Sequence, residues 1–83
     1  MSVEKVEITP TAYWGKRPLY SAKVGTGASN LVVIYRIRKF HINQKIKFCI
    51  ESDVRGMRSE ASLPWCSGRI YDIRGERLFI ERF

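Results

Sequence analysis

Leu31-Val-Val-Ile-Tyr-Arg-Ile-Arg-Lys-Phe40 and Lys45-Ile-Lys-Phe-Cys-Ile-Glu51 are the two stretches that decide the fold. Both are rich in β-branched and aromatic residues, and in their basic parts apolar and charged side chains alternate, a period typical of β-strands. The loop between them is either His41-Ile-Asn-Gln44 or only its two central residues, and both lengths place Phe40 opposite Lys45. The sequence therefore predicts an antiparallel hairpin in which Tyr35 pairs with Ile50 and Ile37 pairs with Phe48.

This register gives the hairpin two different faces. The four apolar residues of the two pairs share one face and are expected to be buried in a core. Arg38 lies directly across from Lys47 on the other face, and like charges opposite each other destabilise a strand pair. We interpret the tolerated repulsion as a sign of a bound anion, although a solvated face with splayed side chains would also explain it. The predicted outer face consists of Arg36, Arg38, Phe40, Lys45, Lys47 and Cys49.

The excess positive charge of the protein is concentrated in the same part of the chain. The 83 residues contain 15 Lys and Arg and 8 Asp and Glu, which gives a formal net charge of +7. Such an asymmetry favours a polyanionic partner, nucleic acid first and an acidic protein or a membrane surface after it. Glu7 and Glu51 are consecutive acids in the sequence, and between them lie Lys16, Arg17, Lys23, Arg36, Arg38, Lys39, Lys45 and Lys47.

The rest of the chain also reads mainly as strands. Val3 to Ile8, Leu19 to Val24 and a C-terminal hairpin over residues 69–83 bring the number of strand candidates to six. The C-terminal hairpin turns near Arg74-Gly75, with Ile70 opposite Leu78 for a three-residue loop or Asp72 opposite Arg77 for a two-residue loop. Its last strand is expected at an edge open to a protein partner. Ser52 to Leu63, with Val54, Met57 and Ala61 at helical spacing, could form one short helix, against which Gly56 argues.

Three segments together resemble the strand-turn-strand rhythm of small OB-fold-like β-barrels of the archaeal information-processing type. They are Val33-Ile-Tyr-Arg-Ile-Arg-Lys-Phe40, Gln44-Lys-Ile-Lys-Phe48 and Gly68-Arg-Ile-Tyr-Asp-Ile-Arg-Gly-Glu-Arg-Leu-Phe-Ile-Glu81. A chain of 83 residues is expected to form one domain, over residues 1–83. The resemblance implies that this domain is an all-β, five- to six-stranded antiparallel barrel. An SH3-like barrel is the alternative, because the strand candidates exceed the five of an OB-fold and the candidate helix follows the fourth. OB-fold proteins commonly bind single strands across one barrel face.

These observations predict a non-catalytic nucleic-acid-binding domain, for DNA or RNA, with single strands favoured. Phosphates are expected on Arg36, Arg38, Lys45 and Lys47, with Lys16, Arg17 and Lys23 in support, and bases on Phe40, Tyr13, Trp14 or Tyr20. The alternative is a small accessory subunit that docks on a larger nucleic-acid enzyme or ribonucleoprotein. In it the basic face meets protein acids and the C-terminal strand adds to the partner's sheet.

Other classes of protein find little support in the sequence. A four-ligand zinc site needs four Cys or His residues, and the chain has only Cys49, Cys66 and His41, so neither a metal nor a cofactor is expected. His41 falls in a predicted turn without a nucleophile and base beside it, so no enzyme is expected. The longest apolar run, Leu31 to Tyr35, is far below the roughly 20 residues of a membrane span. The N-terminus resembles no secretion signal, so we expect a cytoplasmic protein with two reduced thiols.

Overall fold

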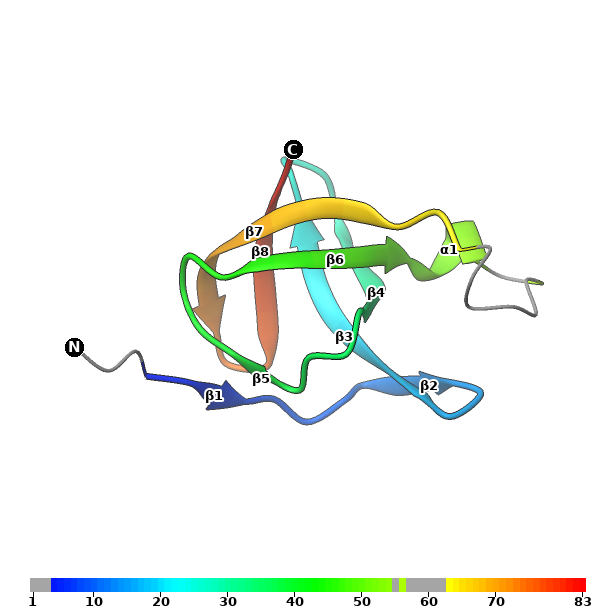
Figure 1. The fold of residues 1–83 in the computed structure, drawn as a ribbon, viewed down its shortest axis with the longest axis horizontal. Helices are drawn as coiled ribbons and strands as arrows, with labels where there is room; N and C mark the ends of the chain where they lie inside the picture. Colours follow the sequence, from blue (N-terminus) through cyan, green and yellow to red (C-terminus); the bar gives the residue numbers. More distant parts are fainter. Residues whose placement is uncertain (1–3, 55, 57–62) are drawn as a thin grey trace.

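The computed structural model describes residues 4–54, 56 and 63–83, and these fold mainly into strands (Figure 1). The one helix among them is α1 (Glu51–Val54). The predicted mainly β fold with one short helix is confirmed. The strands are β1 (Val6–Glu7), β2 (Ala12–Trp14), β3 (Arg17–Val24), β4 (Ser29–Ile34), β5 (Lys39–Phe40), β6 (Lys45–Ile50), β7 (Cys66–Arg74) and β8 (Arg77–Arg82).

Five of the strands close into a small barrel. The sheet order is β2-β3-β4-β6-β7-β8, and β8 also pairs with β3, so the ring runs through β3, β4, β6, β7 and β8. Strand directions alternate around the ring, and an odd number of strands must then close with one parallel pair, which is β3–β8. The ring strands follow one another as a meander, whereas an OB-fold has a Greek-key order. Because β8 is paired on both sides, the expectation of an open C-terminal edge is wrong.

The barrel interior is filled by alternate residues of the ring strands. Phe48, Ile70, Leu78 and Ile80 are fully buried there and are joined by Phe40. The opposite face of β3, β4 and β6 carries a second core of Leu19, Val33, Cys49, Val54 and Leu63, against which Trp14 and Trp65 pack. Both faces of these three strands are therefore buried at this point, and Val54 of α1 covers part of the outer one.

The short pair β1–β5 crosses one end of the barrel, at the bottom of Figure 1. Val6 pairs with Phe40 and Glu7 pairs with Lys39. Ile8 and Phe40 reach the main core, where the Phe40 ring meets the Tyr20 ring edge to face at 5.1 Å between centroids. Phe40 therefore lies in the core, and its predicted place on the exposed basic face is wrong.

The predicted register of the central hairpin is also wrong, by three residues. Ile50 pairs with Val32 and Phe48 pairs with Ile34, and the Tyr35 N–H donates to the Lys47 carbonyl at 2.9 Å. The predicted strand over residues 31–40 is broken after Ile34, because Arg36 adopts a left-handed backbone with φ +54°. Arg38 is consequently not opposite Lys47. The shift by an odd number of residues places Ile34, instead of Tyr35, on the same face as Phe48. Cys49 stays on the opposite face of β6, as predicted, but it is buried there in the second core and not exposed.

The predicted burial and exposure of side chains in residues 35–50 agree with the structure better than the predicted register does. Arg36, Arg38, Lys45 and Lys47 are exposed as predicted, and Phe48 is buried as predicted. The other three residues expected in the core, Tyr35, Ile37 and Ile50, are only partly buried.

The C-terminal hairpin has neither of the predicted registers. Arg74 pairs with Arg77 around the two-residue turn Gly75-Glu76, and a bulge lies between Ile70 and Asp72. Gly75 has φ +59° at the first turn position, the conformation that type II′ hairpin turns require there. Of the predicted helix over residues 52–63, α1 contains the start, while Met57 and Ala61 lie outside the described residues.

Candidate functional site

Five basic residues line one open hollow on the barrel surface. Lys16 lies in the turn between β2 and β3, and Arg17 is the first residue of β3. Arg36 and Arg38 lie in the connection from β4 to β5, and Lys39 is the first residue of β5. The hollow has a volume of about 550 Å³, and no acidic residue is among its described lining residues. We call it the cationic hollow; Pro18, Ile34 and Ile37 complete its lining.

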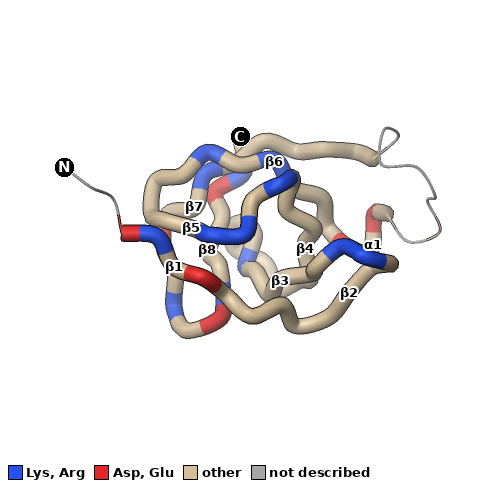
Figure 2. The backbone as a smooth tube through the Cα atoms, turned by 60° about the horizontal axis from the view of Figure 1, so that its bottom comes forward, with Lys and Arg blue, Asp and Glu red and all other residues tan. Residues whose placement is uncertain are grey.

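Local backbone conformation brings these two basic segments out of the sheet. Gly15 has φ +63° in the tight turn where Trp14 pairs with Arg17, which places Lys16 at the tip. Arg36, with φ +54°, lies two residues after the end of β4 and interrupts the extended backbone before the chain continues as β5. A left-handed conformation costs a non-glycine residue roughly 1–2 kcal/mol. Figure 2 shows the basic stretches in the β2–β3 turn, in the β4–β5 connection and along β6.

A second hollow adjoins the first and differs in character. It has a volume of about 480 Å³, and Ile37 lines both hollows, so the two share a wall. Two lysines and two aromatic rings line it, and we call it the aromatic hollow. Its lining consists of Tyr35, Ile37, Lys45, Ile46, Lys47, Ser67, Gly68 and Phe83.

Four residues of the aromatic hollow form a row across neighbouring strands. The Tyr35 N–H bonds to the Lys47 carbonyl, Lys47 pairs with Ser67, and the Phe83 N–H donates to the Ser67 carbonyl at 3.0 Å. Residues directly opposite each other in antiparallel strands project from the same face. Tyr35, Lys47, Ser67 and Phe83 therefore lie side by side on the outer surface, and we call this set the cross-strand row.

The two rings of the row are held differently. Tyr35 meets Trp65 edge to face, with 5.0 Å between ring centroids, and the Arg36 guanidinium lies 5.3 Å from its centroid. Phe83 is 65% exposed, and its backbone N–H is hydrogen-bonded to β7. The Tyr35 ring at one end of the row is therefore held by side-chain contacts, whereas the Phe83 ring at the other end is exposed to solvent.

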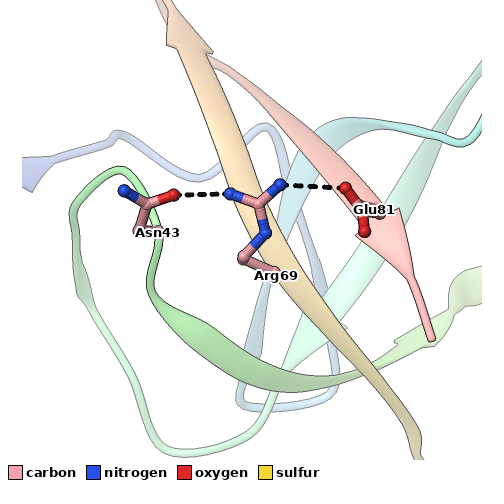
Figure 3. A network of polar contacts seen from close by, with 3 residues as sticks. All are labelled: Asn43, Arg69 and Glu81. Carbon is pink, nitrogen blue, oxygen red and sulfur yellow. Dashed lines mark hydrogen bonds and ion pairs between the residues drawn. The ribbon is translucent and has the colours of Figure 1, made fainter.

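The two hollows together carry the whole charge excess of the protein. Seven of the 15 Lys and Arg residues line them, and the other eight equal in number the 8 acidic residues. Outside the hollows, ion pairs join Arg69 to Glu81 and Arg74 to Asp72. Arg69 also donates to the Asn43 side chain, so Asn43, Arg69 and Glu81 form one polar network (Figure 3).

Two buried groups of the protein have shifted pKa values. Burial raises the pKa of the Tyr20 phenol, and the positive charge of Arg38 opposes this shift. Burial also raises the pKa of the Cys49 thiol to about 11, and nearby Cys66 and Asp53 act in the same direction. Both thiols are free: Cys49 belongs to the outer core, whereas Cys66 packs against the barrel interior.

The structure brings together six of the residues predicted to bind nucleic acid. Five others line neither hollow. Phe40 and Tyr20 are buried in the core, Trp14 is half-buried in the outer core, Tyr13 is exposed on β2 opposite Pro18, and Lys23 pairs with Ser29 on β3. The six are Lys16, Arg17, Arg36, Arg38, Lys45 and Lys47.

Sequence reasoning missed three residues of the site, namely Lys39, Tyr35 and Phe83. Lys39 is one of the eight basic residues between Glu7 and Glu51. Its position in that cluster of basic residues could have identified it as a site residue. Tyr35 was assigned to the core by the wrong register. Nothing in the local sequence places Phe83 beside Lys47, because that proximity depends on the closure of the barrel.

Within residues 4–54, 56 and 63–83, no group of three or more His, Cys, Asp or Glu residues could hold a metal ion. None of the helical segments in this part of the chain is long and apolar enough to span a bilayer. Comparisons of the chain with protein-family models, with curated proteins and with solved structures find no match.

Proposed function

We propose that this domain binds nucleic acid, with single strands preferred, through the cationic hollow and the aromatic hollow and without a catalytic step. One observation carries the proposal: seven Lys and Arg residues line two adjoining hollows that have no described acid in their lining. Clustered like charges repel each other, so the arrangement gains its stabilisation when a polyanion occupies it.

The chemistry of the lining residues fits the phosphate backbone. Arginine and lysine side chains neutralise phosphates and release counterions, which supplies sequence-independent affinity. Arg36, Arg38 and Lys39 are exposed, so their charged groups are available to a ligand without unfolding any part of the barrel. Aromatic rings beside such cations favour single strands, because only unpaired bases can stack on a protein ring.

The accessory-subunit alternative is less well supported. It relied on the C-terminal strand as an open edge, and β8 is paired with both β7 and β3. What remains for it is a contact between the basic surface and an acidic protein. Tight binding of purified single-stranded DNA or RNA argues against this alternative, since no protein partner is then required.

A charge-reversal experiment tests the proposal. We expect the double variant Arg38→Glu/Lys47→Glu to lose most of its affinity for a single-stranded oligonucleotide at low salt. It should retain the fold, because both side chains are exposed. Lys5→Glu/Lys23→Glu is the matched control, since it also reverses two charges and neither lysine lines a hollow. Fluorescence anisotropy with single-stranded and duplex DNA and RNA measures the affinities, and unchanged affinity of the double variant would contradict the proposal.

A further inference from the structure

The aromatic hollow has a feature that phosphate binding alone does not use. A site that only neutralised phosphates would need cations, yet the cross-strand row places an aromatic ring on each side of Lys47 and Ser67. Phe83 exposes 65% of its surface, a large apolar area to leave in water beside two lysines. The combination of exposed ring, cation and hydroxyl suits a nucleotide, which has an apolar face and a phosphate.

We infer that the cross-strand row is a base-stacking site, in which a single strand runs across β6 and β7 with one base on Tyr35 and another on Phe83. The inference rests on the proposed function. Lys47 between the two rings then neutralises a phosphate that links these nucleotides, and the Ser67 hydroxyl offers a hydrogen bond to it.

The dimensions of the sheet support this path. Tyr35 and Phe83 are separated by three strand-to-strand steps, which correspond to about 14 Å along the barrel surface. Such a separation is too large for one base to contact both rings, so the row accommodates more than one nucleotide. The wall shared through Ile37 continues this path into the cationic hollow, where Arg36, Arg38 and Lys39 receive further phosphates.

The fixed position of Tyr35 favours stacking there. Its ring is held by Trp65, and its backbone is held by Lys47, so little side-chain freedom is lost when a base binds. The Arg36 guanidinium lies over the same ring, 5.3 Å from its centroid, and adds a planar cation to the stacking surface. A base near Tyr35 would therefore meet a preformed surface composed of two planar groups.

The test compares two ligands that have the same number of phosphates: a 15-nucleotide oligothymidylate and an abasic oligonucleotide of equal length. We expect the parent protein to prefer the base-containing strand, and we expect Phe83→Leu and Tyr35→Leu each to weaken its binding about 5- to 150-fold. Neither variant should change the affinity for the abasic strand by more than about twofold, because no phosphate contact is removed. Tyr71→Leu is the matched control, since Tyr71 is 40% exposed outside both hollows.

The outcomes separate this inference from the proposed function. Equal affinity for both strands, with Phe83→Leu and Tyr35→Leu unchanged, overturns base stacking and leaves phosphate binding standing. Failure of the parent to bind either strand overturns both. Binding of polyglutamate as tight as that of oligothymidylate also overturns the inference and favours an acidic protein partner. Tyr35 contacts Trp65, so Tyr35→Leu removes a packing contact. If Tyr35→Leu does not fold, the affinity of Phe83→Leu, which alters only an exposed ring, decides whether bases stack on the row.

Discussion

Replacing Phe40 by alanine is expected to lower the free energy of unfolding by about 3–5 kcal/mol, the range measured when buried phenylalanines are truncated. Phe40 has no exposed surface, and its ring meets Tyr20 edge to face at 5.1 Å. It also attaches β5, and through β5 the paired β1, to the end of the barrel. A domain of this length has a total stability of about 4–12 kcal/mol. The variant should therefore lose about a quarter or more of its stability.

Phe83→Ala is the matched control, because the same side chain is removed from a position that is 65% exposed. Its unfolding free energy should stay within about 0.5 kcal/mol of the parent value. Urea unfolding followed by circular dichroism gives both quantities from the midpoint and the slope. If Phe40→Ala unfolds within about 1 kcal/mol of the parent while losing affinity for single strands, Phe40 is a ligand contact and its place in the core is refuted.

Three further predictions concern backbone strain, close packing and a buried thiol. Arg36→Gly should raise the unfolding free energy by up to about 1 kcal/mol, because glycine accepts φ +54° without strain. The same variant should bind nucleic acid more weakly, because it removes a cation from the hollow. A variant that urea unfolding shows to be less stable than the parent would contradict the strain at Arg36. Gly68→Ala should cost about 1–3 kcal/mol, because an added Cβ would lie 2.8 Å from both the Glu81 carbonyl oxygen and Phe48 Cε1; an unchanged melting temperature would count against it. The folded-state pKa of Cys49, about 11, lies above the ordinary value of 9.0, so the unfolded chain loses this proton first and stability should fall as pH rises from about 9 to about 11. Urea unfolding between pH 9 and pH 11 should show a smaller fall in the unfolding free energy for Cys49→Ala than for the parent. Equal falls would contradict a raised pKa of Cys49 in the folded protein.

The sequence predicted the class of fold and the location of the charge because these depend on composition and pattern. Exposed lysine and arginine side chains stay in water whichever register the strands adopt, since burying an unpaired charge is costly. For this reason Arg36, Arg38, Lys45 and Lys47 were placed correctly on the surface although their strand pairing was wrong.

The register of the central hairpin could not be predicted, because the break in residues 31–40 has no local signal. A left-handed residue is usually glycine, asparagine or aspartate, and here it is Arg36. Once β4 ends at Ile34, the chain makes a long excursion before β6, and β5 pairs with β1 instead of with β6. Phe40 is then drawn into the core by contacts with Ile8 and Tyr20, which are distant in the sequence.

The aromatic part of the site depended even more on tertiary structure. Tyr35 and Phe83 lie at the ends of a row that exists because β4, β6, β7 and β8 are neighbours in the ring. No pattern within one strand relates residues 48 positions apart in the chain. Cation clusters can therefore be found from the sequence when they are close together along it, whereas the rings beside them require the strand order.

The salt dependence of binding tests the central claim most directly. Affinity for a single-stranded oligonucleotide should fall linearly on a plot of log K against log salt concentration, with a slope of up to about −5 if all seven lining cations contact phosphates. The variant Arg38→Gln/Lys47→Gln should reduce the magnitude of this slope by about 1.4, and Lys23→Gln should leave it unchanged. A parent slope near zero, or one slope shared by the parent and the double variant, would contradict nucleic-acid binding through the two hollows.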